Sequence, residues 1–202
     1  MKMPSVIFDV GAHHGQTSQH FHKCFASAII HSFEPFSENF DALRLNIKRK
    51  KRIKVNQLAL GENQEDVTLQ IGLHGQSHQI TNFKKEVQDC IKSVKVRMET
   101  IDNYMKNEKL THIDLLKIDV EGYEIEVLKG AKDALKNGRV DFILAECDFN
   151  LADKQHTYFE NLLKYLNCRN FSFFGLYEVN HYANRMGIGF CNALFIKRSS
   201  KS

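Results

Sequence analysis

The chain has 202 residues, a length that fits one domain with a substantial buried core, and its apolar (43%) and charged (26%) fractions are ordinary for a globular protein. No apolar run is long enough to span a bilayer and the first residues show no signal-peptide pattern, so we expect a cytoplasmic protein without a membrane span. The net charge of +4 is mild, and the five cysteines form no CxxC pair, so we expect neither a nucleic-acid partner nor a zinc site or disulfide framework.

Short apolar runs alternate with helical patterns along most of the chain. The run from Val6 to Val10 is apolar at nearly every position, as expected of a strand that is covered on both faces. Runs of this kind predict strands over residues 6–10, 29–33, 55–60, 113–118, 140–145, 171–176 and 190–196. Apolar residues at helical spacing predict helices over residues 17–25, 37–47, 125–135 and 159–166, with Ser37 as the N-cap of the second helix.

The region between Gly61 and Met98 is less regular. Residues 67–71 and 94–98 alternate between apolar and polar side chains, which is typical of antiparallel strands with one solvated face. A polar segment rich in Gly and His separates them. We therefore expect an inserted hairpin whose loop, residues 72–93, is a candidate substrate region, because loops of this length in a domain are usually functional.

Repeated β-α units that end in two strands without an intervening helix predict a specific α/β topology. Successive parallel strands joined by right-handed crossovers form a doubly wound sheet. The last two strands are connected by a loop too short for a helix, which predicts an antiparallel pair. The sequence thus favours one domain over residues 1–202, built on a mostly parallel seven-stranded sheet with an antiparallel C-terminal hairpin. Ligands of such sheets bind at the carboxyl ends of the strands.

The first strand leads into a glycine-containing turn, Asp9-Val10-Gly11-Ala12-His13-His14-Gly15. The two glycines let the backbone turn sharply and approach a ligand without a Cβ in the way. Glu34 ends the second strand, where its carboxylate can accept hydrogen bonds from both ribose hydroxyls of a nucleoside. The turn and this acid together predict a nucleoside site.

The chemistry of the turn narrows the choice of nucleoside. A dinucleotide site requires G-x-G-x-x-G, whereas this chain has His13 in place of the second glycine. The Asp9 carboxylate is poorly placed for phosphate but suits a cationic amino group, directly or through water. S-adenosylmethionine carries such a group and no phosphate, so it is the favoured ligand. A turn with purely structural glycines and a nicotinamide dinucleotide remain as alternatives.

A second group of polar residues follows the strand at 113–118. Asp119 and Glu121 stand where that strand ends, at the edge where ligands bind, and Glu124 has the position of a favourable first-turn charge of a helix. Lys117 lies inside the apolar strand, so its ammonium must be paired or must reach the sheet edge.

These segments together resemble the FkbM family of methyltransferases. The resemblance covers about residues 5–150, and its most distinctive part is the run from Lys117 to Glu124, Lys-Ile-Asp-Val-Glu-Gly-Tyr-Glu. The other matching segments, in chain order, are the turn at 9–15, Phe33-Glu34-Pro35, Ala59-Leu60-Gly61, Thr100-Ile101-Asp102 and Val127-Leu128-Lys129-Gly130-Ala131.

The resemblance implies a class I, Rossmann-like methyltransferase. Such an enzyme transfers a methyl group from S-adenosylmethionine, usually to a hydroxyl of a sugar, glycan or secondary metabolite. The family often has asparagine where this chain has His13, a departure that leaves the expected fold intact. The residues expected to bind the cofactor are Asp9, Gly11, Ala12, His13, Gly15, Thr17, Glu34, Pro35, Ala59, Asp119 and Gly122.

Methyl transfer to a hydroxyl is an in-line displacement that a general base assists by accepting the proton. The candidate catalytic residues are Asp119 and Glu121, followed by Glu146 at the end of the fifth strand and His181 between the last two strands. The acids at 119 and 121 could also hold magnesium, but we expect no metal ion. The expected substrate contacts are Ser77, His78, Tyr123 and Asn180.

The identity of the acceptor is not encoded in a motif. Its recognition is expected from the loops at 72–93, 147–157 and 178–188 or from the second subunit of a homodimer. A small molecule or a glycan is the expected partner. Two further hypotheses remain: a catalytically inactive cofactor-binding protein, which the acids at 119 and 121 argue against, and a nicotinamide-dependent oxidoreductase, which the turn chemistry disfavours.

Overall fold

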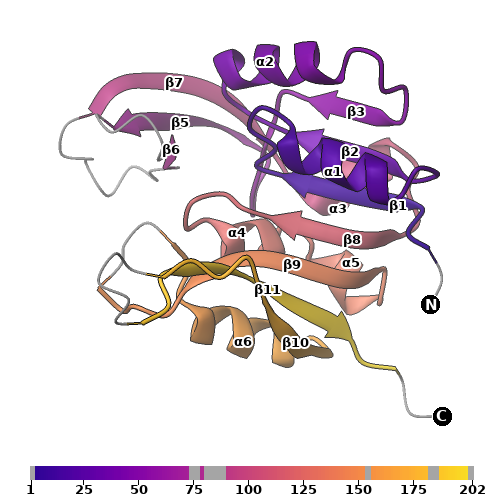
Figure 1. The fold of residues 1–202 in the computed structure, drawn as a ribbon, viewed down its shortest axis with the longest axis vertical. Coiled ribbons are helices and arrows are strands. Elements are labelled where there is room, and N and C mark those ends of the chain that lie inside the picture. Colours follow the sequence, from indigo (N-terminus) through magenta and orange to yellow (C-terminus); the bar gives the residue numbers. More distant parts are fainter. Residues whose placement is uncertain (1–2, 73–77, 80–89, 153–155, 182–186, 200–202) are drawn as a thin grey trace.

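The computed structural model describes residues 3–72, 78–79, 90–152, 156–181 and 187–199. A seven-stranded sheet runs through it in the order β10-β11-β9-β8-β1-β2-β3 (Figure 1). Neighbouring strands are parallel except in the two pairs that contain β11. The predicted sheet class and the antiparallel C-terminal pair are therefore confirmed. The strands are β1 (Val6–Val10), β2 (Ile29–Phe33), β3 (Ile53–Asn56), β8 (Ile113–Ile118), β9 (Val140–Asp148), β10 (Phe171–Tyr177) and β11 (Phe190–Lys197).

Helices cover both faces of this sheet through two separate cores. Phe21 and Leu43 of the first two helices pack with Ile7 in one core, whereas Phe8 belongs to the larger core formed with the later helices. Adjacent residues of β1 thus face opposite sides, as the period of a strand requires. The helices are α1 (Gln16–Cys24), α2 (Ser37–Ile47), α3 (Ile101–Asn107), α4 (Glu124–Lys129), α5 (Lys132–Lys136) and α6 (Phe159–Asn167).

The inserted hairpin is part of a second, four-stranded sheet in the order β4-β7-β5-β6. Its strands β5 (Glu65–Gly72) and β7 (Cys90–Glu99) are antiparallel, as predicted, and extend away from the central sheet (Figure 1). The other two strands are β4 (Ala59–Leu60) and β6 (His78–Gln79). The single strand expected over residues 55–60 is wrong, because the chain leaves the central sheet after Asn56 and pairs with β7 through Ala59 and Leu60.

Two expectations about helices also need correction. Ser37 is the first helical residue of α2, while Phe36 occupies the N-cap and makes no side-chain cap hydrogen bond. The helix expected over residues 125–135 is two short helices, α4 and α5, that meet at Gly130. A Cβ on Gly130 would lie 2.0 Å from the backbone oxygen of Gly61, so the chain segments approach too closely at this point for any side chain. The Asp102 carboxylate accepts hydrogen bonds from two backbone N–H groups at the start of α5, which stabilises the break.

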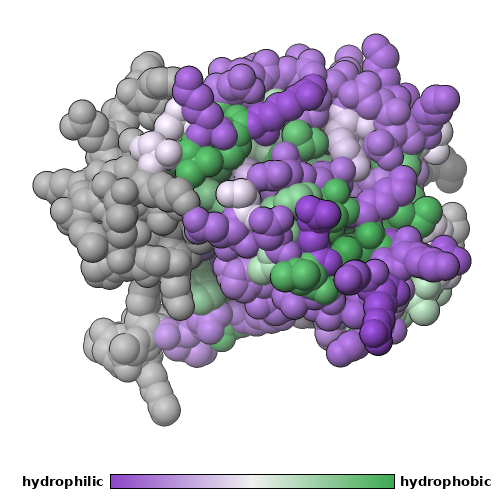
Figure 2. Space-filling view, turned by 90° about the horizontal axis from the view of Figure 1, so that it is seen from above, coloured by the Kyte–Doolittle hydropathy of each residue, from purple (hydrophilic) through white to green (hydrophobic). Residues whose placement is uncertain are grey.

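Figure 2 shows the molecule from above, turned by 90° from Figure 1. The part of this surface that is coloured is mostly hydrophilic, with apolar side chains scattered between polar ones. Scattered apolar residues are normal on a protein surface. Among the described residues, no helix combines the length and the apolar character that a membrane crossing requires.

A buried histidine in strand β2 makes the stability of the protein depend on pH. His31 is fully buried, its Nδ1 lies 2.8 Å from the Tyr104 hydroxyl, and burial, assisted by the charge of Lys54 and opposed by Glu108, lowers its pKa from 6.5 to about 4. Because the unfolded chain binds the proton more tightly, stability is complete above pH 6.5 and is lost as pH falls towards 4. Between pH 7 and pH 4.5 we expect this group alone to lower the free energy of unfolding by about 2 kcal/mol.

Urea denaturation at the two pH values, with His31→Phe as the matched variant, checks this expectation. Phenylalanine fits the surrounding aromatic cluster and cannot titrate, so the variant should lose less stability on acidification than the wild type. Equal losses in both proteins would show that His31 is not the cause.

Candidate functional site

At one edge of the sheet lie the carboxyl ends of the neighbouring strands β9, β8, β1 and β2. Backbone hydrogen bonds join the segments at the ends of β8, β1 and β2. Asp119 N donates to the oxygen of Val10, and the N–H groups of Gly11 and Ala12 both donate to the oxygen of Phe33. The glycine turn, the end of β2 and the acidic segment after β8 therefore form one continuous edge. This is the edge that the sequence predicts for ligand binding.

The glycine turn has the left-handed conformations that its glycines allow. Gly11 has φ +77° and Gly15 has φ +87°. A Cβ on Gly11 would lie 1.8 Å from the backbone oxygen of Asp119, and one on Gly15 would lie 2.5 Å from Leu43 Cδ1. The space beside each glycine is thus occupied by the protein itself. These glycines permit the turn and its close packing, which differs from the expectation that they make room for a ligand.

Glu34 connects the turn to the end of β2. Its side chain is buried, with the residue only 4% exposed. Oε2 accepts a hydrogen bond from His13 N at 2.9 Å, and Oε1 accepts from Phe36 N at 3.0 Å and from Asn39 Nδ2 at 3.5 Å. Burial raises the pKa of this carboxyl, and these hydrogen bonds oppose the rise. Each carboxylate oxygen can accept about two hydrogen bonds. Oε1 already accepts two and Oε2 accepts one, so a ligand can donate a further hydrogen bond to Oε2.

Lys117 lies at the centre of a buried charge network. Its Nζ is 3.2 Å from Asp9 Oδ1, from Asp119 Oδ2 and from the backbone oxygen of Gly11. Burial alone would lower the pKa of Lys117, but the charges of Asp9 and Asp119 outweigh burial and raise it. Ser18 Oγ donates to the other oxygen of Asp9.

The network places the two acids differently with respect to solvent. Asp9 is completely buried, whereas the side chain of Asp119 is 35% exposed. Asp9 therefore acts on the site through Lys117 and Ser18, and Asp119 is the acid of this pair that faces the edge.

The segment after β8 is held in an unusual backbone shape by a buried acid. Glu121 has φ +54° and Gly122 has φ +92°. Glu124 Oε1 accepts hydrogen bonds from Val120 N at 3.0 Å and Gly122 N at 3.3 Å, and its Oε2 accepts from the Thr157 hydroxyl. From the sequence, the only role expected for Glu124 is that of a favourable negative charge in the first turn of a helix. In the structure it is 1% exposed and determines the shape of the loop that carries Glu121.

Three carboxyl groups meet at the end of β9. Burial raises the pKa of Glu146 to about 9, helped by the negative charges of Asp119 and Glu121 and by a hydrogen bond with Asp119. His156 Nε2 lies 3.8 Å from Glu146 Oε2. Possible ligand atoms of Glu121, Glu146 and His156 all lie within 4.8 Å of one another. The structure thus brings together three of the four predicted catalytic residues and adds His156, which the sequence analysis placed only within a candidate loop.

The remaining predicted residues occupy varied environments. Tyr123 is half-buried and packs between two parts of the core, while Asn180 and His181 are exposed and contact their own loop. Ser77 lies outside the described residues, and for His78 the structure describes only the backbone, in β6. Of the other predicted cofactor-binding residues, those buried are Ala12 and Ala59, and those half-buried are Thr17 and Pro35.

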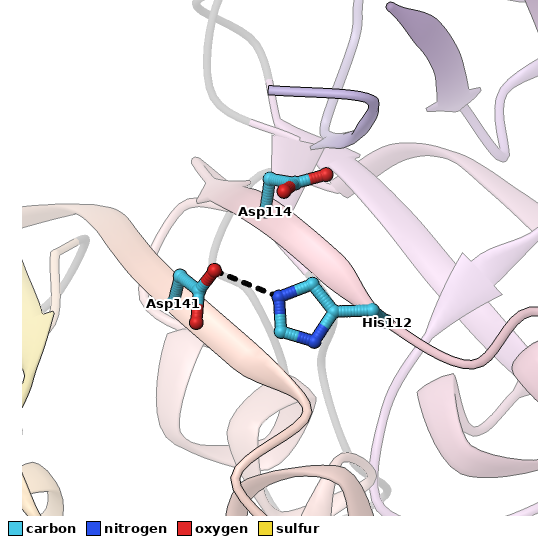
Figure 3. Close-up of side chains that lie close together, drawn as sticks. All are labelled: His112, Asp114 and Asp141. Atoms are coloured by element: carbon cyan, nitrogen blue, oxygen red, sulfur yellow. Dashed lines mark hydrogen bonds and ion pairs between the residues drawn. The ribbon is translucent and has the colours of Figure 1, made fainter. Parts of the chain in front are cut away.

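A second group of possible ligands, His112, Asp114 and Asp141, lies where β8 and β9 begin, at the opposite edge of the sheet (Figure 3). Its polar atoms have partners within the protein. Asp141 contacts His112 Nε2 at 2.8 Å and Lys197 Nζ at 2.5 Å, and Asp114 Oδ2 accepts from two backbone N–H groups near the N-terminus. These contacts within the protein indicate that the group stabilises the fold.

A known family matches most of the chain. A sequence model described as the methyltransferase FkbM domain matches residues 9–173. The chain belongs to this family. The resemblance predicted from the sequence is thereby confirmed. The matched range contains the glycine turn, Glu34, the acidic segment after β8 and His156, but it ends before the loop that carries Asn180 and His181.

Two curated relatives are methyltransferases by name. The hexuronic acid methyltransferase AglP of Haloferax volcanii is 28% identical over 156 residues, which are 75% of this chain and 59% of the relative. The 2-O-methyltransferase NoeI of Sinorhizobium fredii is 26% identical over 157 residues, covering 72% of this chain and 64% of the relative. The chain thus spans less than two thirds of the length of these relatives.

Solved structures share the fold at low sequence identity. M. capricolum TrmK, solved with S-adenosyl-homocysteine, matches with a TM-score of 0.55 and 11% identity over 98% of this chain and 65% of that chain. Precorrin-6y C5,15-methyltransferase from Geobacter metallireducens matches with a TM-score of 0.52 and 11% identity over 96% of this chain and 80% of that chain. The predicted class I methyltransferase fold is confirmed.

Proposed function

We propose that this protein is an S-adenosylmethionine-dependent methyltransferase that acts on a hydroxyl of a sugar, glycan or secondary metabolite. The observation that carries the proposal is the sheet edge at which a left-handed glycine turn, the buried Glu34 and a cluster of acids meet. Family membership supports methyl transfer, and the names of the relatives support an oxygen acceptor of the sugar type.

The charges at the edge suit the proposed cofactor. Among the described residues of this edge, the carboxyl groups of Asp9, Glu34, Asp119 and Glu121 outnumber the ammonium of Lys117, while Glu146, with its pKa raised to about 9, is neutral at pH 7. A surplus of acids favours a ligand with a positively charged sulfur and an ammonium group, and it disfavours a pyrophosphate. The surplus of acids therefore argues against a nicotinamide-dependent oxidoreductase, because the nicotinamide dinucleotide carries a pyrophosphate.

Individual residues can be given roles in binding. Glu34 Oε2 can accept one more hydrogen bond, which we assign to a ribose hydroxyl. The same oxygen accepts a hydrogen bond from His13 N and so holds the glycine turn in place. Asp119, partly exposed and bound to Lys117, is the candidate for the cationic amino group. Asp9 serves as a positioning residue because its carboxylate is enclosed by Lys117 and Ser18.

The reaction follows from the same groups. The bound cofactor supplies a methyl group on a positively charged sulfur. As the acceptor oxygen forms its bond to the methyl carbon and the carbon–sulfur bond breaks, the hydroxyl proton passes to a carboxylate of the protein. Asp119 and Glu121 are more exposed than Glu146, and Asp119 is already assigned to the amino group, so the base role is assigned first to Glu121. A positioned base contributes about 10²–10⁴-fold to such reactions.

Incubation with isotopically labelled S-adenosylmethionine and a panel of uronic acids, other sugars, glycans and hydroxylated secondary metabolites tests the proposal. We expect label to enter at least one hydroxyl compound and the transfer to fall about 100-fold or more in Glu121→Gln, which lacks the proposed base. Cofactor binding without transfer to any acceptor class would instead support a catalytically inactive binding protein.

A further inference from the structure

We propose that Glu121, Glu146 and His156 bind a divalent metal ion beside the methyl-transfer site. The three side chains come from three different segments: the loop after β8, the end of β9 and the segment before α6. Their ligand atoms lie within 4.8 Å of one another, and Glu146 Oε2 is 3.8 Å from His156 Nε2. The sequence favoured no metal ion, because it gave no sign that His156 would join these acids.

The three side chains can reach a single ion if they rotate towards it. Carboxylate oxygens and imidazole nitrogens bind first-row divalent ions at about 2.0–2.2 Å, so neighbouring ligands of one ion lie about 2.8–3.6 Å apart at tetrahedral or octahedral angles. A pair of ligand atoms at the 4.8 Å limit must therefore come closer by about 1–2 Å, through rotation of the side chains, when the ion binds. One imidazole and two carboxylates suit manganese or zinc, which accept mixed nitrogen and oxygen ligands.

The surrounding structure holds these ligands in position. The backbone on both sides of Glu121 is bound by the buried Glu124 carboxylate, through Val120 N and Gly122 N. The ring of His156 stacks on Phe190 with centroids 5.3 Å apart and planes inclined by 8°. Glu146 lies in a strand and is paired in register with Asn192 of β11. A metal site gains affinity from ligands that are oriented in this way before the ion binds.

The group at the opposite edge of the sheet provides an internal comparison. His112, Asp114 and Asp141 have a similar composition, but Lys197 supplies a cation to Asp141 and backbone N–H groups bind Asp114. A metal ion there would have to displace these partners. Because the Lys197 ammonium already supplies a positive charge to Asp141, this group serves as the comparison for the group at the carboxyl edge.

The position of the ion suggests what it does, and this part of the inference rests on the proposed function. Three protein ligands leave coordination positions for acceptor oxygens, and a neighbouring pair of sugar hydroxyls can occupy two of them. A bound cation lowers the pKa of a hydroxyl that coordinates it, which favours the loss of its proton during methyl transfer. The preferred acceptor class is therefore a sugar or polyol with adjacent hydroxyls.

Titration of the metal-free protein with Mn²⁺ alone, followed by the electron paramagnetic resonance signal of free Mn²⁺, tests the inference. We expect one bound ion per chain in the wild type and at least a tenfold weaker affinity in Glu121→Gln and in His156→Ala. His112→Ala, at the comparison group, should bind Mn²⁺ as the wild type does. Thermal unfolding of each variant verifies that it is folded, and Glu121→Gln retains the size and backbone preference of the original residue.

Absence of bound Mn²⁺ at millimolar concentration, or an affinity that is unchanged in both site variants, would overturn the metal site. An equal loss in His112→Ala would overturn it as well. Because this titration contains neither cofactor nor acceptor, its outcome is independent of cofactor binding. A protein that binds S-adenosylhomocysteine but no Mn²⁺ would refute this inference while leaving the proposed function in place, and the reverse pattern would refute only the proposed function.

Discussion

Replacement of Glu34 by alanine should weaken the binding of S-adenosylhomocysteine about 10- to 100-fold, and more than Glu146→Ala does. Two effects combine in this expectation. The variant loses a carboxylate that is proposed to accept a ribose hydroxyl, and hydrogen bonds to charged groups are worth about 1.5–3 kcal/mol. It also loses the acceptor of His13 N and Phe36 N, which holds the glycine turn at the end of β2.

Isothermal titration calorimetry of both variants with S-adenosylhomocysteine measures the difference. Thermal unfolding without ligand separates the loss of the ribose contact from a general loosening of the turn, since only loosening lowers the melting temperature of the ligand-free protein. Equal losses of affinity in Glu34→Ala and Glu146→Ala, or a larger loss in Glu146→Ala, would contradict the ribose assignment.

Gly11→Ala should destabilise the protein severely, by about 4 kcal/mol or more. The residue has φ +77°, and its Cβ would lie 1.8 Å from the backbone oxygen of Asp119. Left-handed conformation alone costs about 1–2 kcal/mol for alanine. The collision adds to this, because relieving it requires the backbone of β1 or β8 to move. Since domains are stable by about 5–15 kcal/mol, we expect the variant to be partly unfolded or poorly soluble at 37 °C.

Gly138→Ala is the matched control. Gly138 has φ +64°, but a Cβ at this position would have Lys197 Cδ as its nearest neighbour at 3.8 Å, an ordinary contact. This variant should therefore lose only the conformational part, about 1–2 kcal/mol, in urea denaturation. Similar losses in the two variants would show that the contact with Asp119 is not what requires glycine at position 11.

The central sheet was predictable because its strands are covered on both faces. The mainly apolar runs at Val6–Val10 and Ile113–Ile118 coincide with β1 and β8 residue for residue. The loop before the last strand is too short for a helix, so the antiparallel C-terminal pair was also predictable. The run over residues 55–60 was misread because apolar character does not reveal that a chain moves from one sheet to another. That exchange depends on the long-range pairing of Ala59 and Leu60 with β7.

The candidate site was predictable where its residues stand at the ends of parallel strands. Glu34 and Asp119 stand at strand ends, and the order of the parallel strands brings them to one edge. His156 could not be found in this way, because only the folded chain brings the segment before α6 against the end of β9. Glu124 was visible in the sequence, but its role depends on burial and on Thr157, which is 33 residues away in the chain.

The proposed function depends on the binding, at this sheet edge, of a nucleoside with a positively charged sulfur or of its demethylated product. Calorimetric titration of the purified wild-type chain with S-adenosylhomocysteine, and separately with NAD, is the decisive experiment. We predict saturable binding of one S-adenosylhomocysteine per chain and no measurable heat with NAD. Binding of NAD, or the absence of any S-adenosylhomocysteine binding by the folded protein, would contradict this prediction.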